Sequence, residues 1–153
     1  MAFILSKQRH SDNSDQNWVQ YMGYLNSVRD RFPKNAFKIA TSEWWYSFDK
    51  PEAPHDSRLI NFTMSDTIEK NNQYCRITVE LESAYSGRIT LRYPIVEKYQ
   101  LNMPGTNITR THGDWRYDEF SLSDDGLIIH TIEWADGPDW IITASDIIHE
   151  YSP

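Results

Sequence analysis

Alternating apolar and polar residues in the stretch 73–101 constrain the fold of this chain more than any other feature. The apolar members form two runs on either side of a short glycine-containing segment, 83–87: Cys75, Ile77, Val79 and Leu81, then Ile89, Leu91 and Tyr93. A period of two residues on both sides of such a connection is typical of a β-hairpin with one buried face. We expect this hairpin to lie centrally in an antiparallel sheet. Pro94 should mark an edge or a bulge, because proline cannot donate to a ladder.

The rest of the chain predicts one helix and further strands. A helix from about 14 to 32, capped by Ser14 or Asp15 and ended before Pro33, would turn an apolar stripe toward a core. The stretch 66–72 is expected to be a loop, and 35–41 fits either a helix or an extended segment. Four strands are expected besides the central hairpin: 58–66, 115–123, 127–134 and 140–148.

These elements predict the α+β class, in which an N-terminal amphipathic helix packs on an antiparallel sheet of about six strands. The 153 residues correspond to a single domain, with a helical part at about 14–41 and a β part at about 56–150. The N-terminal residues lack the pattern of an export signal, and no apolar run is long enough to span a bilayer. We therefore expect a soluble, cytoplasmic protein that does not bind membranes.

Negative charge is concentrated near the C-terminus. The chain has a net charge of −7, yet the segment 114–150 alone holds ten acidic residues and one basic residue, Arg116. An acidic surface of this kind repels nucleic acid and attracts a basic protein, although it can equally be a merely solvated face. The candidate partner-binding acids are Asp114, Asp118, Asp124, Asp125, Asp136 and Asp139.

An unusually aromatic segment, 43–48, precedes a proline-containing loop. Trp44 and Trp45 in this segment are candidates for anchoring a partner, since tryptophan is enriched in binding hot spots. The alternative is that they close one end of the core. We expect one of the two to do so and leave the role of the other open.

Histidines and nucleophiles give no pattern that predicts catalysis or metal binding. None of the five histidines has a short metal-ligand spacing, and the single cysteine, Cys75, lies on the apolar side of a strand. His130 alternates with apolar residues and should be buried and hydrogen-bonded. His55 and Asp56 precede a strand, where we expect them to be structural, with the Asp56 carboxylate accepting bonds from the following amides. We predict no enzymatic activity, cofactor or metal.

Two short motifs carry a resemblance to a known group of proteins. They are Pro54-His55-Asp56-Ser57-Arg58-Leu59, and the run 126–134 followed by Asp136-Gly137 and Trp140-Ile141-Ile142. Over about 45–148 the chain resembles small bacterial domains, some of which are similar to immunity proteins of polymorphic-toxin and contact-dependent competition systems. This resemblance implies a non-enzymatic cytoplasmic protein that neutralises a cognate toxin, and it transfers no catalytic residues.

Three functions follow as hypotheses. The first is an immunity-type inhibitor that binds a toxin with a basic cleft, such as a nuclease. The second is a small-ligand-binding or enzymatic domain with a pocket near Trp44, His55 and His130. The third is a structural subunit of a larger assembly that uses the aromatic segment as an interface. The sequence does not indicate an oligomeric state.

Overall fold

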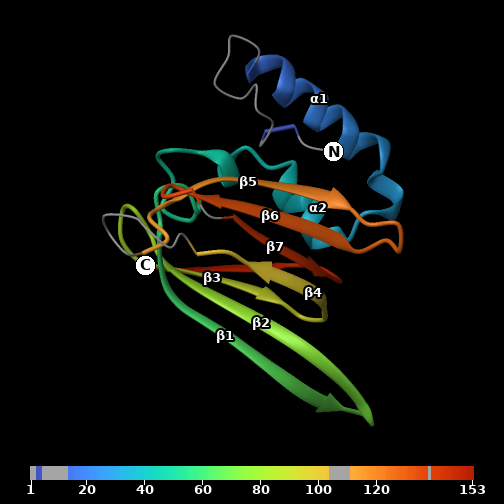
Figure 1. Cartoon of the computed structure of the whole chain (residues 1–153). Helices are drawn as coiled ribbons and strands as arrows, with labels where there is room; N and C mark the ends of the chain where they lie inside the picture. The colour runs from blue at the N-terminus through green and yellow to red at the C-terminus, as the bar shows by residue number, and fades with distance from the viewer. Residues whose placement is uncertain (1–2, 5–13, 104–110, 138) are drawn as a thin grey trace.

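The computed structural model describes residues 3–4, 14–103, 111–137 and 139–153. The chain forms two α-helices, two short 3-10 helices and eight β-strands among these residues (Figure 1). The helical elements are α1 (Ser14–Ser27), η1 (Arg29–Arg31), α2 (Lys34–Ala40) and η2 (Trp44–Tyr46). The strands are β1 (Arg58–Glu69), β2 (Asn72–Glu82), β3 (Arg88–Tyr93), β4 (Val96–Leu101), β5 (Trp115–Leu122), β6 (Ile128–Trp134), β7 (Asp139–Ala144) and β8 (Ile148–Ser152).

The strands form two antiparallel sheets, with orders β1-β2-β3-β8 and β4-β7-β6-β5. The predicted α+β class is confirmed, but the single sheet of about six strands was wrong. The chain leaves the first sheet at Tyr93 and enters the second at Val96, and Pro94 lies at this corner. The expected strand 140–148 is also divided, because β7 ends at Ala144 and β8 returns to pair with β3. The break falls at 145–147, within the stretch that we expected to be one strand.

The central hairpin of β2 and β3 is confirmed. Val79 lies opposite Leu91, and Leu81 lies opposite Ile89, in the middle of the first sheet. Both pairs are fully buried, as is Ile77. Large buried side chains from both sheets meet in one core, which explains why the alternation in this stretch is so regular.

A second hairpin, formed by β1 and β2, replaces the loop that we expected at 66–72. β1 continues to Glu69 and β2 starts at Asn72, so only Lys70 and Asn71 form the turn. Their φ angles of 49° and 67° are those of a tight hairpin turn. Because β3 pairs with β2 only from Ile77 onward, the outer part of this hairpin projects from the body as a two-stranded ribbon (Figure 1).

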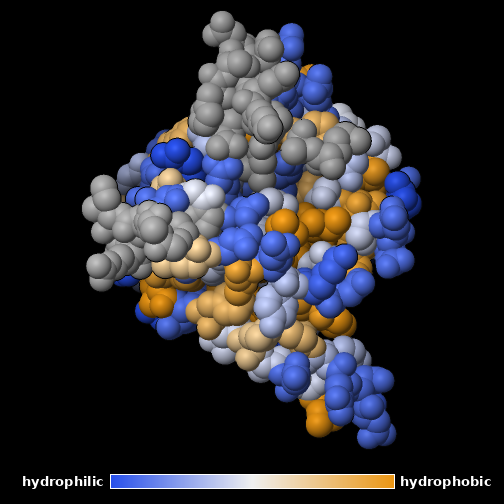
Figure 2. All heavy atoms as spheres, viewed as in Figure 1, coloured by the Kyte–Doolittle hydropathy of each residue, from blue (hydrophilic) through white to orange (hydrophobic). Residues whose placement is uncertain are grey.

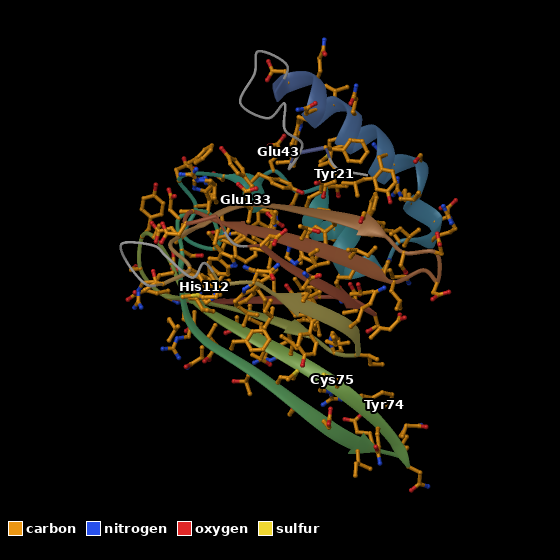
Figure 3. The ribbon with its side chains drawn as sticks, viewed as in Figure 1. Tyr21, Glu43, Tyr74, Cys75, His112 and Glu133 are labelled. Atoms are coloured by element: carbon orange, nitrogen blue, oxygen red, sulfur yellow. The ribbon has the colours of Figure 1, made fainter. Side chains whose placement is uncertain are left out.

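Helix α1 runs along the outer edge of the second sheet rather than on the face of a six-stranded sheet. The amide of Phe120 donates to the hydroxyl of Tyr21 at 2.8 Å, and the amide of Leu122 donates to that of Tyr24 at 2.9 Å. Figure 3 shows Tyr21 between α1 and β5. The two tyrosines therefore satisfy edge amides of β5 that would otherwise need water or another strand.

The helical segment is also more divided than predicted. α1 ends at Ser27, and the turn of 3-10 helix η1 carries the chain to Phe32. After Pro33 the ambiguous segment is the helix α2, whose first amides are capped from a distance by Asp146. No helix among the described residues is long and apolar enough to cross a membrane.

Candidate functional site

A chain of four polar side chains crosses the core where the two sheets meet. Tyr93 Oη lies 2.7 Å from Nδ1 of His130, and Nε2 of His130 lies 2.8 Å from Oδ2 of Asp118. The indole Nε1 of Trp45 donates to both oxygens of Asp118, at 2.9 and 3.1 Å. The four residues come from β3, β6, β5 and η2, so the network joins both sheets to the helical segment.

Burial sets the protonation of this network. His130 is fully buried and Asp118 is only 4% exposed. Desolvation raises the pKa of the Tyr93 hydroxyl well above its usual value, and the nearby Asp118 charge raises it further. The Tyr93 hydroxyl therefore stays protonated and is available as a donor. We assign it as the donor to Nδ1 of His130, and in this tautomer Nε2–H donates to Asp118. The ring of Phe120 stacks on the imidazole at 4.0 Å and holds it in place.

A pocket of about 380 Å³ opens beside this network. Asp118 and Trp45 belong both to the network and to the pocket wall. The other walls come from the start of α1, from the segment 46–55 and from the first residues of β5. The lining residues are Ile4, Asn17, Trp18, Trp45, Tyr46, Phe48, His55, Trp115, Arg116, Tyr117 and Asp118.

Aromatic rings form most of the pocket wall, and they brace one another. Trp18 and Tyr46 meet edge to face with ring centroids 4.7 Å apart, and Phe48 meets His55 in the same way at 4.2 Å. Tyr46 is tied down because its hydroxyl donates to the Ala40 carbonyl at 2.8 Å. Trp18 and Phe48 remain partly exposed, at 37% and 66%, and so lie at the mouth.

His55 lines the pocket, and one of its ring nitrogens makes no hydrogen bond. Its Nδ1 atom is shielded from solvent and makes no hydrogen bond with good geometry. Oδ2 of Asp56 lies 3.0 Å away, but the contact is misaligned and acts as an ion pair only when the imidazole is protonated. Because Nδ1 is closed to solvent and faces Asp56, His55 contributes its ring, rather than this atom, to the pocket wall.

The sequence placed six aspartates on a partner-binding surface, and the structure separates them. Asp118 is not on the surface, because it is buried in the core network. Asp114, Asp124 and Asp125 are exposed, whereas Asp136 and Asp139 are half-buried. Asp139 also accepts a bond from the side-chain amide of Asn102 at 2.8 Å.

These acids do not gather on one face. Asp124 and Asp125 lie in the turn between β5 and β6, and Asp114 lies at the opposite end of the same hairpin. Other acids of the segment 114–150 have internal partners: Asp146 caps α2, and Glu150 pairs with Arg92. Alternation along a strand predicted one acidic face, but the hairpin and these internal partners divide the charge.

The aromatic and histidine candidates also differ in position. Trp45 is buried in the core and pocket wall, whereas Trp44 is half-buried and contacts the ring of His149 at 4.8 Å. His55 reaches the pocket, but neither Trp44 nor His130 lines it. The expected pocket therefore forms beside this set rather than among all three members.

Asp56 does not accept the bonds that we expected from the following amides. Its carboxylate is 59% exposed and contacts only His55, while its backbone has a φ of 62°. Ser57 fixes the loop instead, since its hydroxyl and its amide both donate to the Pro54 carbonyl. Within the described part of the chain, no three His, Cys, Asp or Glu side chains lie close enough to hold a metal ion. His10 lies outside the described residues.

Sequence reasoning missed several pocket residues, namely Asn17, Trp18, Phe48, Arg116 and Tyr117. The aromatic segment 43–48 was a usable signal, but its meeting with α1 and β5 depends on contacts far apart in the chain. In comparisons with known proteins, no family model, no curated protein and no solved structure matches this chain. The function is therefore argued from the geometry of the site.

Proposed function

We propose that this chain is a non-enzymatic binding protein whose pocket holds a small organic molecule with an aromatic or aliphatic part and one hydrogen-bonding group. The observation that carries the proposal is the aromatic-lined cavity of about 380 Å³ with a few polar atoms in its wall. Ligand sites are commonly cavities of roughly 300–1,000 Å³ with this composition.

The wall assigns a place to each part of the ligand. Its apolar part packs against the wall formed by Trp18 and Tyr46, whose edge-to-face contact already fixes both rings. Its polar group faces the part of the wall that holds His55 and Arg116. Arg116 is exposed at the pocket and favours a ligand whose outer end is neutral or anionic.

Binding without turnover fits the chemistry of the nearby polar groups. A general base needs an accessible nitrogen within hydrogen-bond reach of the substrate. His130 is fully buried and both of its nitrogens are engaged, by Tyr93 and by Asp118. We therefore assign the network a structural role, in which it holds Asp118 and Trp45 rigidly in the pocket wall.

A panel of small aromatic compounds, some carrying a hydroxyl or carboxyl group, tests the proposal by calorimetry. Trp18→Ala should weaken binding at least about tenfold, because a large buried aromatic contact is lost. Val19→Ala is the matched control, since Val19 is the next residue on α1, is exposed and does not line the pocket. Equal affinities for both variants would contradict the proposed site.

An immunity-type function is the second candidate, and the exposed pair Asp124 and Asp125 favours it. We propose that these acids, in the β5–β6 turn, attract the basic cleft of a cognate toxin. Unpaired surface charges of one sign accelerate association with an oppositely charged partner. The resemblance of the two sequence motifs to immunity proteins supports the same partner class.

Capture of a toxin from the source cell, followed by association kinetics, tests this candidate. Reversing both Asp124 and Asp125 to lysine should lower the on-rate, and raising the salt concentration should have the same effect. Reversing Asp114, at the other end of the hairpin, is the matched control. An acidic partner, or an on-rate that ignores salt, would contradict this candidate.

A further inference from the structure

The projecting ribbon of β1 and β2 ends in a two-stranded segment that the rest of the chain does not support. β3 covers β2 only from Ile77 to Glu82, so the residues from about 65 to 76 pair only with each other. A two-stranded hairpin alone is marginally stable in water. Figure 3 places Tyr74 and Cys75 on this outer part of β2.

Apolar side chains of β1 extend the core face of the sheet into solvent. Phe62 belongs to that face, because its ring contacts Trp140 at a centroid distance of 5.3 Å. Alternation puts Met64 and Ile68 on the same face, where they are 45% and 71% exposed. Figure 2 shows hydrophobic atoms among polar ones at the tip of the ribbon.

The outer side of β1 is an edge of the first sheet. Among the described residues β1 pairs only with β2, apart from one isolated bridge between Arg58 and Asp114. The pairing alternates along β1 from the two-residue turn, so every second residue points its amide and carbonyl away from β2. These residues are Phe62, Met64, Asp66 and Ile68. Edge strands are commonly protected by lysine, proline or inward charges; between Leu59 and Ile68 there is no lysine or proline, and the one charge is Asp66, on the same face as Met64 and Ile68.

We infer that this edge binds the same edge of a second copy of the chain, with β1 antiparallel to β1 around a two-fold axis at Ser65. In this register Ser65 faces Ser65 of the other copy, and Phe62 faces Ile68. Thr63 faces Thr67, Met64 faces Asp66, and Asn61 faces Glu69. Threonine and serine pairs and an apolar pair are favourable across strands, and no like charges are opposed.

Neighbouring registers fit less well. If the axis lies at Asp66, the Asp66 carboxylate faces the same carboxylate of the second copy. A shift to Met64 opposes Arg58 with Lys70 and places Phe62 against Asp66. The registers at Met64, Ser65 and Asp66 all use the outward-pointing backbone groups of both strands, so the side-chain pairs decide between them. The register at Ser65 joins the two four-stranded sheets into one of eight strands, with their core faces on the same side.

Disulfide trapping of the full-length chain tests this inference. Ser65→Cys in a Cys75→Ser background should form a symmetric disulfide under mild oxidation, since residues opposite each other at the axis lie about 4.5–5.5 Å apart by Cα. Thr63→Cys in the same background is the matched control. Its two copies would be separated by four residues along the strands, roughly 14 Å, and should not cross-link.

Light scattering of the unmodified chain completes the test. At about 100 μM the mass should be twice the monomer value of 18.0 kDa. A monomer at this concentration would overturn the inference. Equal cross-linking of the Ser65→Cys and Thr63→Cys variants would also overturn it, because the register would then be wrong.

Discussion

Removal of the Asp118 carboxylate should destabilise the fold in a way that distinguishes two substitutions. The carboxylate accepts bonds from two buried donors, Trp45 Nε1 and, in the assigned tautomer, His130 Nε2. Asp118→Ala leaves both donors without an acceptor, at about 1–3 kcal/mol each. Relief of the buried charge offsets part of this loss. We expect the free energy of unfolding to fall by about 2–5 kcal/mol.

Asp118→Asn should cost less, because both donors converge on Oδ2, at 2.9 Å from Trp45 and 2.8 Å from His130. An asparagine oxygen at that position keeps both bonds without their charge assistance, but an NH2 group replaces Oδ1 and cannot accept the second bond from Trp45, at 3.1 Å. We expect a loss of about 1–2 kcal/mol. Urea unfolding followed by circular dichroism measures the unfolding free energy of each variant and so shows which is the more stable.

With a urea dependence of about 2 kcal/mol per molar, the midpoint for Asp118→Ala should fall by roughly 1–2.5 M. A loss below about 1 kcal/mol for Asp118→Ala would show that the carboxylate does not organise the core. An asparagine variant less stable than the alanine variant would contradict the assigned bonds.

Three further predictions concern separate parts of the fold. Asp146→Ala removes the acceptor of the Asn35 and Ala36 amides at the start of α2, and should cost about 0.5–2 kcal/mol in urea unfolding. Asp56→Val should cost about 1–2 kcal/mol in the same assay because of the positive φ at this position, whereas Asp56→Gly should be near neutral. Burial lowers the pKa of His149, so its stabilising contribution is complete above its unfolded pKa of about 6.5 and is lost as the pH falls toward the lowered folded value. In His149→Gln, the decline in unfolding free energy between pH 7.5 and 5 should therefore be smaller.

The central hairpin could be predicted from sequence because both of its strands bury one face in the core. Ile77, Val79 and Leu81 alternate with polar residues for that reason, and Leu91 follows the same rule. The outer ribbon has no core beneath it, so its residues from 66 to 72 are polar on both faces except for Ile68 and resemble a loop. Lys70 and Asn71 also lack the glycine that usually marks a tight hairpin turn.

The site could be predicted only in part, because its contacts are long-range. The segment 43–48 was recognised by its aromatic composition, and His55 by its position before a strand. Nothing local indicates that Asp118 is buried, since its partners lie 73 and 12 residues away, at Trp45 and His130. An acidic residue among many acids reads as a surface charge until the partner that buries it is known.

The acid count also predicted more than the fold allows. Ten acids in the segment 114–150 suggested one continuous negative face, but in the folded chain several of them bind groups of the protein itself. Asp118 binds Trp45, and Asp146 caps a helix. Net charge describes the whole surface and does not determine where individual carboxylates lie.

Crystallographic fragment screening of the full-length chain tests the proposed pocket most directly. The account predicts fragments packed against Trp18 and Tyr46, with a polar atom facing the part of the wall that holds His55 and Arg116. It also predicts that Asp118 and Trp45 keep their positions on binding, because the core network holds them. Fragments that bind only at other surfaces, or a pocket that stays empty throughout a diverse aromatic library, would contradict the claim that this cavity is a ligand site.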